Sequence, residues 1–211
     1  MRKLLLTLLP LLVGAAPASL PTLAPDRPLV VAFGDSLTAG YGLEPGLGFA
    51  PQLEATLRRH GIAATVEDAG VSGDTTSGGR GRLGWTLDGL GRKPDLVIVE
   101  LGGNDMLRSV DTRVTEENLD AMLAELKRRD IPVLLAGMRA VRNADPAYIR
   151  AFESLYPAMA EKHGVPLYPF FLEGAALQRG MIQPDGIHPT FEGVKQIVTR
   201  ITPAVKAALG S

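Results

Sequence analysis

The 211-residue chain contains no cysteine. This absence excludes disulfides, thiolate metal ligands, a cysteine nucleophile and lipid attachment to an N-terminal cysteine of the mature chain. A large excess of one charge is absent as well, because 22 basic and 23 acidic residues give a formal net charge of −1. The balance therefore gives no reason to expect nucleic acid or an acidic membrane surface as a partner.

Apolar runs long enough to span a membrane are also absent, and the run near the start has the pattern of an export signal. Two basic residues precede a leucine-rich run, which Pro10 interrupts, and small residues 14–19 follow it. The pattern predicts a signal peptide over residues 1–24, with cleavage near Ala18 or Ala24. The mature protein is then expected in the periplasm or outside the cell, with no stable membrane insertion. The alternative is an uncleaved N-terminal anchor.

Residues 25–211 alternate strand and helix patterns, without repeats or low-complexity linkers. The run from Leu29 to Phe33 is apolar and rich in β-branched residues, which is typical of a strand buried on both faces. Further strands are expected over residues 64–69, 95–101, 131–138 and 165–170. This alternation predicts one α/β domain with a parallel sheet and helices on both faces.

Local signals place helices between these strands. Apolar spacing predicts one helix from Phe49, a glycine-rich helix over 77–91 and a last helix that includes Phe191. Thr115 is the expected N-cap of the third helix. The next helix is expected to begin at Asp145-Pro146, with Pro157 kinking or splitting it.

Polar loops follow three of the expected strands, at residues 34–36, 70–75 and 102–105. Because the C-terminal ends of parallel strands lie at one edge of a sheet, these loops are expected to meet there. A fourth polar loop, residues 183–189, precedes the last helix and needs only to fold over the same edge.

Ser36 is a candidate nucleophile in the first of these loops. A serine hydroxyl becomes an effective nucleophile once a base takes its proton. His188 is the candidate base, and Asp185 can fix its tautomer, although an Asp-x-x-His pair is also compatible with a helix-capping aspartate beside an exposed histidine. His60 and His163 each precede a glycine at an expected helix end, and we interpret both as helix-terminal residues without a catalytic function.

Attack by a serine would create an oxyanion that requires hydrogen-bond donors. The candidates are the backbone N–H groups of Ser36 and Gly73 and the side-chain amide of Asn104. For Gly73 and Asn104 taken separately, ordinary turn chemistry is the alternative. Three aspartates near these loops are interpreted as partners of local backbone amides: Asp35, Asp74 and Asp105. A metal site is not expected, because the chain offers one suitable histidine and no cysteine.

Together, four sequence blocks resemble those of the SGNH (GDSL) hydrolases. The blocks are Gly34-Asp35-Ser36-Leu37-Thr38, Ser72-Gly73-Asp74-Thr75, Gly102-Gly103-Asn104-Asp105 and Asp185-Gly186-Ile187-His188-Pro189. They occur in the family's order and near its spacing, and the resemblance extends over residues 29–202. The resemblance is strong to one branch of the family, the bacterial thioesterase I / protease I / lysophospholipase L1 proteins, which are often labelled arylesterases. This branch has a stretch similar to residues 168–172. The family commonly has asparagine where Asp68 stands, and this difference affects the hydrogen bonding expected in the second loop.

The resemblance implies a three-layer α/β/α sandwich, flavodoxin-like, with five parallel strands in the order 2-1-3-4-5. It implies Ser36 as nucleophile, His188 as base and Asp185 as the group that orients it. It also implies an oxyanion hole built from Ser36, Gly73 and Asn104.

These inferences predict a serine hydrolase that cleaves carboxylic esters or thioesters through an acyl-Ser36 intermediate and needs no cofactor. Met138, Ala140 and Val141 are expected to edge the acyl pocket. Short-chain aryl esters, acyl thioesters and lysophospholipids are compatible substrates. A carbohydrate O-acetyl esterase is an alternative that uses the same catalytic parts. A flavodoxin-like module that binds FMN or a phosphate is the non-enzymatic alternative, although the first loop lacks a Ser/Thr-rich phosphate cradle.

Overall fold

The computed structural model describes residues 27–210, and the expected signal peptide lies outside this range. Five parallel strands form one sheet in the order β2-β1-β3-β4-β5, as the sequence predicts. The strands are β1 (Leu29–Gly34), β2 (Thr65–Gly70), β3 (Leu96–Glu100), β4 (Val133–Ala136) and β5 (Leu167–Tyr168).

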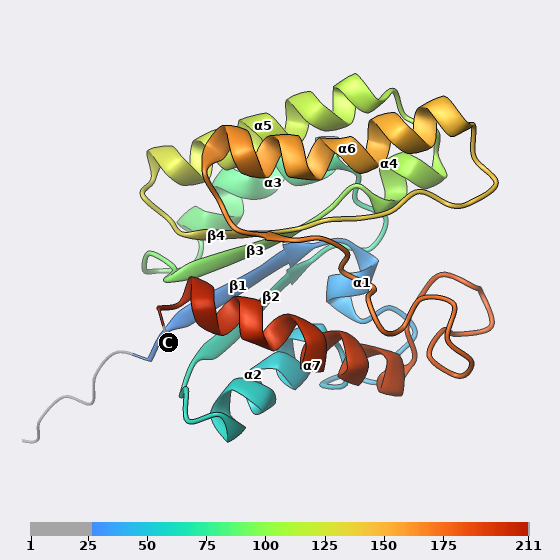
Figure 1. Cartoon of the computed structure of the whole chain (residues 1–211). Helices are drawn as coiled ribbons and strands as arrows, with labels where there is room; N and C mark the ends of the chain where they lie inside the picture. Colours follow the sequence, from blue (N-terminus) through green and yellow to red (C-terminus); the bar gives the residue numbers. More distant parts are fainter. Residues whose placement is uncertain (1–26, 211) are drawn as a thin grey trace, which may run out of the picture.

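Helices cover both faces of the sheet and complete a three-layer α/β/α sandwich (Figure 1). One face carries α2 (Phe49–Arg59) and α7 (Phe191–Ala208), which pack against each other. The other carries α3 (Thr76–Asp88), α5 (Thr112–Arg128) and α6 (Pro146–His163), of which α5 contacts both neighbours. Two short helices follow strand ends: α1 (Ser36–Ala39) and α4 (Gly103–Leu107).

The central strands are buried along their whole length, because helices shield both faces of the sheet. Their apolar side chains pack with the inner stripes of the helices, including Leu53 of α2, Leu119 of α5 and Ile197 of α7, all of which are buried. This packing explains why β1 and β3 are nearly continuous hydrophobic runs and do not alternate with polar residues. The core therefore gives rigid support to the turns at the strand ends.

Three local predictions differ from the structure. The helix with Thr115 as its expected N-cap begins four residues earlier, because Asp111 is its N-cap, and Thr115 lies buried inside it. Asp111 is the better cap because its side chain accepts from the Arg113 amide. Of the two effects expected of Pro157, a kink or a split, the split does not occur, because α6 is continuous from Pro146 to His163. The fifth strand is only two residues long.

The strand ends bring the polar loops to one edge of the sheet. Gly34, at the end of β1, pairs in register with Gly70 of β2 and Glu100 of β3. Gly34 has no room for a side chain, because a Cβ atom there would clash with the Thr38 hydroxyl and with Glu100. The glycine therefore allows the turn after β1 to lie directly against β3.

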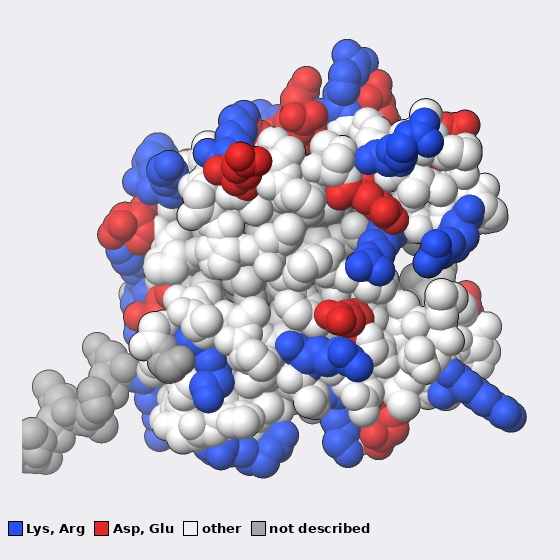
Figure 2. Space-filling model, in the orientation of Figure 1, with Lys and Arg blue, Asp and Glu red and all other residues white. Residues whose placement is uncertain are grey.

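The surface carries basic and acidic side chains interspersed on the face drawn in Figure 2. This mixture agrees with the near-zero net charge of the chain. Of the helices in residues 27–210, none is both long enough and apolar enough to cross a membrane.

Candidate active site

Ser36 is the first residue of α1, at the C-terminal end of the central strand β1. The preceding residue, Asp35, caps this short helix, because its Oδ1 atom accepts a hydrogen bond from the Leu37 amide at 2.9 Å. Ser36 as a whole is 8% exposed, so the residue is largely buried in the turn. The strand-to-helix turn therefore presents one hydroxyl at the edge of the sheet where ligands bind in open α/β folds.

The loop before α7 folds over this edge and brings His188 to Ser36. The His188 Nε2 atom lies 2.9 Å from the Ser36 Oγ atom, and its Nδ1 atom lies 2.7 Å from the Asp185 Oδ2 atom. The Ile187 amide, the His188 ring and the His188 amide donate to Asp185 and lower the pKa of its carboxyl to about 2. An ionised carboxylate can only accept, so Nδ1 carries the proton and Nε2 is free to accept from the serine hydroxyl.

Gln183 fastens this loop to the segment that follows α1. Its side-chain amide donates to the backbone carbonyls of Tyr41 and Pro189, at 2.8 and 2.9 Å. The Tyr41 ring lies beside the His188 ring, with 4.5 Å between the centroids. These contacts tie the loop that carries the imidazole to the segment after α1, and they were not predicted from the sequence.

The two remaining donor candidates lie on neighbouring loops. Gly73 has a φ of +85°, a left-handed conformation that favours glycine, and its carbonyl accepts from the Arg108 guanidinium at 2.9 Å. The Asn104 Nδ2 atom donates to Asp35 Oδ2 at 3.1 Å and to the Asp74 carbonyl at 3.0 Å. Both amide protons of Asn104 therefore have partners within the protein.

A buried polar network ties these loops to the scaffold. The Asp105 carboxylate accepts from the backbone amide and hydroxyl of Thr76, at 2.8 and 2.5 Å, and from the Thr115 hydroxyl at 3.3 Å. Asn118 on α5 also donates to the Thr76 hydroxyl. The start of α3, helix α4 and helix α5 are thus joined at one carboxylate, which fixes the spacing between the second and third loops.

The interpretation of the three aspartates as partners of local backbone amides was correct for Asp35, which accepts from the Leu37 amide. It was wrong for Asp105, whose backbone partner is the Thr76 amide, 29 positions away in the chain. It was also wrong for Asp74, whose side chain forms an ion pair with Arg82 at 2.6 Å. The same guanidinium donates to the Gly34 carbonyl and lies over the Phe33 ring. Arg82 therefore links the second loop to the end of β1. Asp68, where the family commonly has asparagine, accepts from the Gly70 amide at 2.9 Å.

The three residues expected to edge an acyl pocket lie in different surroundings. Met138 is buried, and its Cε atom lies 3.4 Å from the position that a Cβ atom on Gly103 would occupy. Ala140 is partly buried against the core, whereas Val141 is exposed. Met138 is therefore adjacent to the turn that carries Asn104, and Val141 is available to solvent.

Glu100 is a buried residue at this edge that the sequence analysis missed. It is 1% exposed, and its Oε2 atom accepts from the Thr38 hydroxyl at 2.8 Å and the Asp35 amide at 3.4 Å. Within residues 27–210, its Oε1 atom has no hydrogen-bond partner. Burial, reinforced by the nearby Asp35 carboxylate, raises the pKa of Glu100 well above its ordinary value. The signal in the sequence is a single acid that ends an otherwise apolar strand.

Replacing Glu100 with glutamine is expected to remove a pH-dependent loss of stability. In the unfolded chain the carboxyl ionises near its ordinary pKa of 4.5, whereas the folded protein retains the proton to higher pH. The contribution of Glu100 to wild-type stability therefore falls as the pH rises above 4.5 and the unfolded state loses its proton, by up to ~1.4 kcal/mol per pH unit until the folded carboxyl also titrates. Glu100→Gln lacks this slope.

The measurement is urea unfolding of both proteins at several pH values from 4.5 to 8. The free energy of unfolding of Glu100→Gln minus that of the wild type should increase with pH. Any pH-independent effect of the glutamine amide on the free energy of unfolding shifts this difference equally at every pH and does not change its slope. A difference that stays constant or decreases would show that the folded protein holds Glu100 ionised.

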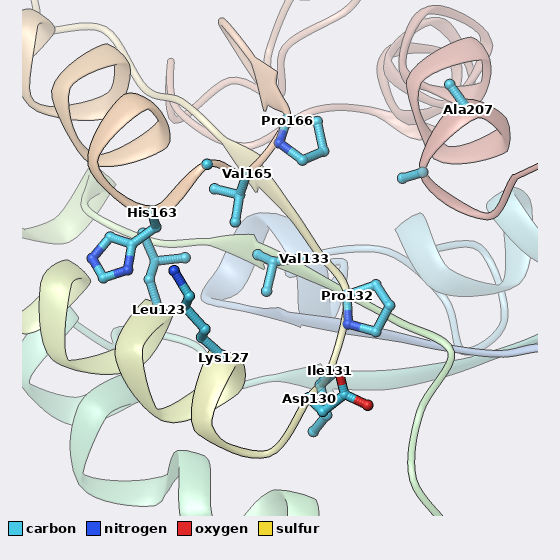
Figure 3. Close-up of a pocket in the computed structure, with 12 residues that line it drawn as sticks. Leu123, Lys127, Asp130, Ile131, Pro132, Val133, His163, Val165, Pro166 and Ala207 are labelled. Atoms are coloured by element: carbon cyan, nitrogen blue, oxygen red, sulfur yellow. The ribbon is translucent and has the colours of Figure 1, made fainter.

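The structure also contains a cavity of about 470 Å³ far from Ser36. It lies at the N-terminal ends of β4 and β5, between Lys127, Val133, His163 and Pro166, and so at the opposite edge of the sheet (Figure 3). The His163 Nε2 atom lies 2.7 Å from the Oδ1 atom of Asp120 on α5. In the part of the chain that the structure describes, no group of three or more His, Asp or Glu side chains is arranged to hold a metal ion.

Comparison with known proteins agrees with this geometry. Residues 32–196 match the family model described as GDSL-like Lipase/Acylhydrolase family. The chain belongs to this family. As a GDSL-like acylhydrolase it is an enzyme that cleaves carboxylic esters.

Individual relatives of this GDSL-like acylhydrolase cover most of the chain. Esterase TesA of Pseudomonas aeruginosa is 38% identical over 176 residues, which are 83% of this chain and 87% of TesA. Thioesterase 1/protease 1/lysophospholipase L1 of Escherichia coli is 37% identical over 156 residues, 74% of this chain and 73% of that protein. The crystal structure of AlinE4, an SGNH-hydrolase family esterase, is 47% identical, with a TM-score of 0.75 and coverage of 90% of this chain and 100% of AlinE4.

Proposed function

We propose that the protein hydrolyses small carboxylic esters and thioesters by two-step acyl transfer, with Ser36 as the nucleophile. His188 is the general base and acid, and Asp185 orients it. The observation that carries the proposal is the chain of two short contacts, 2.9 Å from Ser36 Oγ to His188 Nε2 and 2.7 Å from His188 Nδ1 to Asp185 Oδ2. A serine within hydrogen-bonding distance of a base that is itself oriented by a third group is the arrangement required for nucleophilic catalysis.

In the first step, Ser36 Oγ forms a bond to the carbonyl carbon of the substrate while its proton moves to His188 Nε2. The carbonyl oxygen becomes an oxyanion. In our proposal it accepts from the backbone amides of Ser36 and Gly73 and from the side chain of Asn104. The bond from carbon to the leaving group then breaks, and His188 gives its proton to the departing alcohol or thiol.

In the second step, water attacks the acyl-Ser36 ester along the same route. His188 takes a proton from the water, the oxyanion forms again at the same donors, and the bond to Ser36 Oγ breaks as His188 returns the proton to the serine. The products are the carboxylic acid and the free enzyme. The ionised Asp185, whose pKa is lowered to about 2, stabilises the imidazolium that exists between the two proton transfers.

A fluorophosphonate probe tests the proposed nucleophile directly. Its phosphorus accepts a serine oxygen and loses fluoride, leaving a stable adduct that peptide mass spectrometry can locate. The wild-type protein should carry one adduct, on Ser36, and the Ser36→Ala variant none under the same conditions. Labelling at another serine, or equal labelling of the variant, would contradict the proposal.

The acyl side of the substrate is proposed to lie against Met138, Ala140 and Val141. Met138 is beside Gly103, and its apolar side chain suits an aliphatic or aryl acyl group. The name of the Escherichia coli relative supports thioesters and lysophospholipids as substrates beside aryl esters. Rates over p-nitrophenyl esters of increasing chain length, an acyl thioester and a lysophospholipid would rank these classes, and preferential hydrolysis of acetylated xylan would favour a carbohydrate esterase instead.

We also propose that the protein is exported. The support is the sequence of residues 1–24, in which basic residues, a leucine-rich run and small residues follow one another. N-terminal sequencing of the protein recovered from the periplasm tests this point, since export predicts a new N-terminus near residue 19 or 25.

A further inference from the structure

The amide of Asn104 occupies an unusual position for an oxyanion donor. Its nitrogen has two protons, and the structure gives both of them acceptors, Asp35 Oδ2 at 3.1 Å and the Asp74 carbonyl at 3.0 Å. To receive an oxyanion, Asn104 must release one of these two bonds. Which bond is kept then decides the orientation of the amide during the reaction.

The two acceptors differ in charge and in rigidity. Asp35 is 1% exposed and is fixed at its other oxygen by the Leu37 amide at the start of α1. A hydrogen bond to a carboxylate is about twice as strong as one between neutral groups. The Asp74 acceptor is a neutral carbonyl in the loop between β2 and α3. The bond to Asp74 should therefore open, while the bond to Asp35 is kept.

The groups around Asp35 determine whether it carries the charge that this argument requires. Three titratable side chains act on Asp35: Glu100 on β3, Asp74 in the loop after β2 and His188 in the loop before α7. Arg82 on α3 pairs with Asp74. Burial raises the pKa of Asp35 to about 6, against the lowering by the Leu37 amide, the Asn104 side chain and His188. Glu100 has one oxygen without a donor among the described residues, whereas both Asp35 oxygens have donors. At neutral pH the negative charge of this buried pair therefore lies on Asp35.

We propose that Asp35 is a positioning residue for ester hydrolysis, whose carboxylate holds the amide of Asn104 so that its second proton points at the oxyanion. The same carboxylate caps the helix that begins with Ser36, so one buried side chain sets the nucleophile and a donor relative to each other. This inference rests on the proposed function, since it requires Asn104 to be an oxyanion donor.

The test is a double-mutant cycle with Asp35→Asn and Asn104→Ala, measured as kcat and KM on a p-nitrophenyl ester. An asparagine at position 35 has one acceptor oxygen, so it can bond the Leu37 amide or Asn104 but not both. Asn104→Ala should lower kcat by about 10²- to 10³-fold. Asp35→Asn should lower kcat by about 10- to 100-fold with KM within about twofold, and the double variant should match Asn104→Ala within about twofold.

Asp111→Asn is the matched control, because Asp111 also caps a helix by accepting from the amide two residues on, and within residues 27–210 the hydrogen bonds of its carboxylate all go to Arg113. It should leave kcat unchanged. Asp35→Ser is a second variant that keeps a capping oxygen and cannot reach Asn104, and it should lose kcat as Asp35→Asn does. Circular dichroism and urea unfolding show which variants are folded.

The outcomes separate the two proposals. Full kcat in Asn104→Ala would remove Asn104 from the oxyanion hole and overturn the role of Asp35, while ester hydrolysis by Ser36 and His188 would stand. A loss in Asn104→Ala together with unchanged or increased kcat in folded Asp35→Asn and Asp35→Ser would overturn the role of Asp35 alone. Losses that multiply in the double variant would also overturn it, because Asp35 would then act independently of Asn104.

Discussion

Replacement of Ser36 by alanine is expected to lower kcat on p-nitrophenyl esters by at least about 10⁴-fold. The reason is that no other group can form the acyl intermediate at the position that His188 Nε2 faces, 2.9 Å from Ser36 Oγ. The residual rate would come from the oxyanion donors and from substrate binding, which the substitution leaves in place. KM should change little, since one buried hydroxyl contributes little to ground-state binding.

A matched serine variant makes this result specific. Ser154 lies exposed on α6, where its hydroxyl donates to the Ala151 carbonyl, and it is far along the chain from the four loops. Ser154→Ala should retain the wild-type kcat. If folded Ser36→Ala keeps more than a few per cent of the wild-type rate, Ser36 is not the nucleophile.

Replacement of His188 by alanine should cause a loss of similar size, about 10⁵-fold or more in kcat. Without the imidazole, the serine proton has no acceptor, and the Asp185 carboxylate loses the group that it orients. Because serine and base act as a unit, their losses should not multiply. The kcat of the Ser36→Ala, His188→Ala double variant should lie within a few-fold of the kcat of each single variant.

His163 offers a close control for this experiment. Its Nε2 atom lies 2.7 Å from the Asp120 carboxylate, so it is also a histidine paired with an aspartate, but at the far edge of the sheet (Figure 3). His163→Gln should keep the wild-type kcat. An equal loss of kcat in His163→Gln and His188→Ala would indicate that removing either histidine–aspartate pair disturbs the fold. A His188→Ala variant with the wild-type kcat would exclude His188 as the base.

The parallel direction of the strands could be read from the sequence pattern, whereas their order was implied by the resemblance to the SGNH hydrolases. The apolar run from Leu29 to Phe33 and the alternation of strands and helices depend on local chemistry, and buried parallel strands leave a clear pattern of that kind. Element ends were less accurate. Thr115 has the chemistry of an N-cap, but the fold uses it inside a helix to satisfy Asp105, a contact between residues ten positions apart.

The residues brought together at the sheet edge were also predictable in part. Ser36, Gly73 and Asn104 were expected there because their loops follow strand ends. His188, which lies 152 positions after Ser36, was expected there because the loop before the last helix can fold over the same edge. A sequence indicates which side chains reach the edge, because parallel strands end there. It does not indicate how they compete for hydrogen bonds.

The sequence alone determined the fold class, the edge at which the polar loops collect and the residue types available for acyl transfer, since these depend on patterns within short segments. Only the tertiary structure decided that both protons of Asn104 are already bonded, that Asp74 pairs with Arg82, and that Glu100 lies beneath the turn with a raised pKa. Each of these depends on burial and on distances of a few ångströms between residues from different elements. Such quantities arise when the layers pack, and no local pattern of residues contains them.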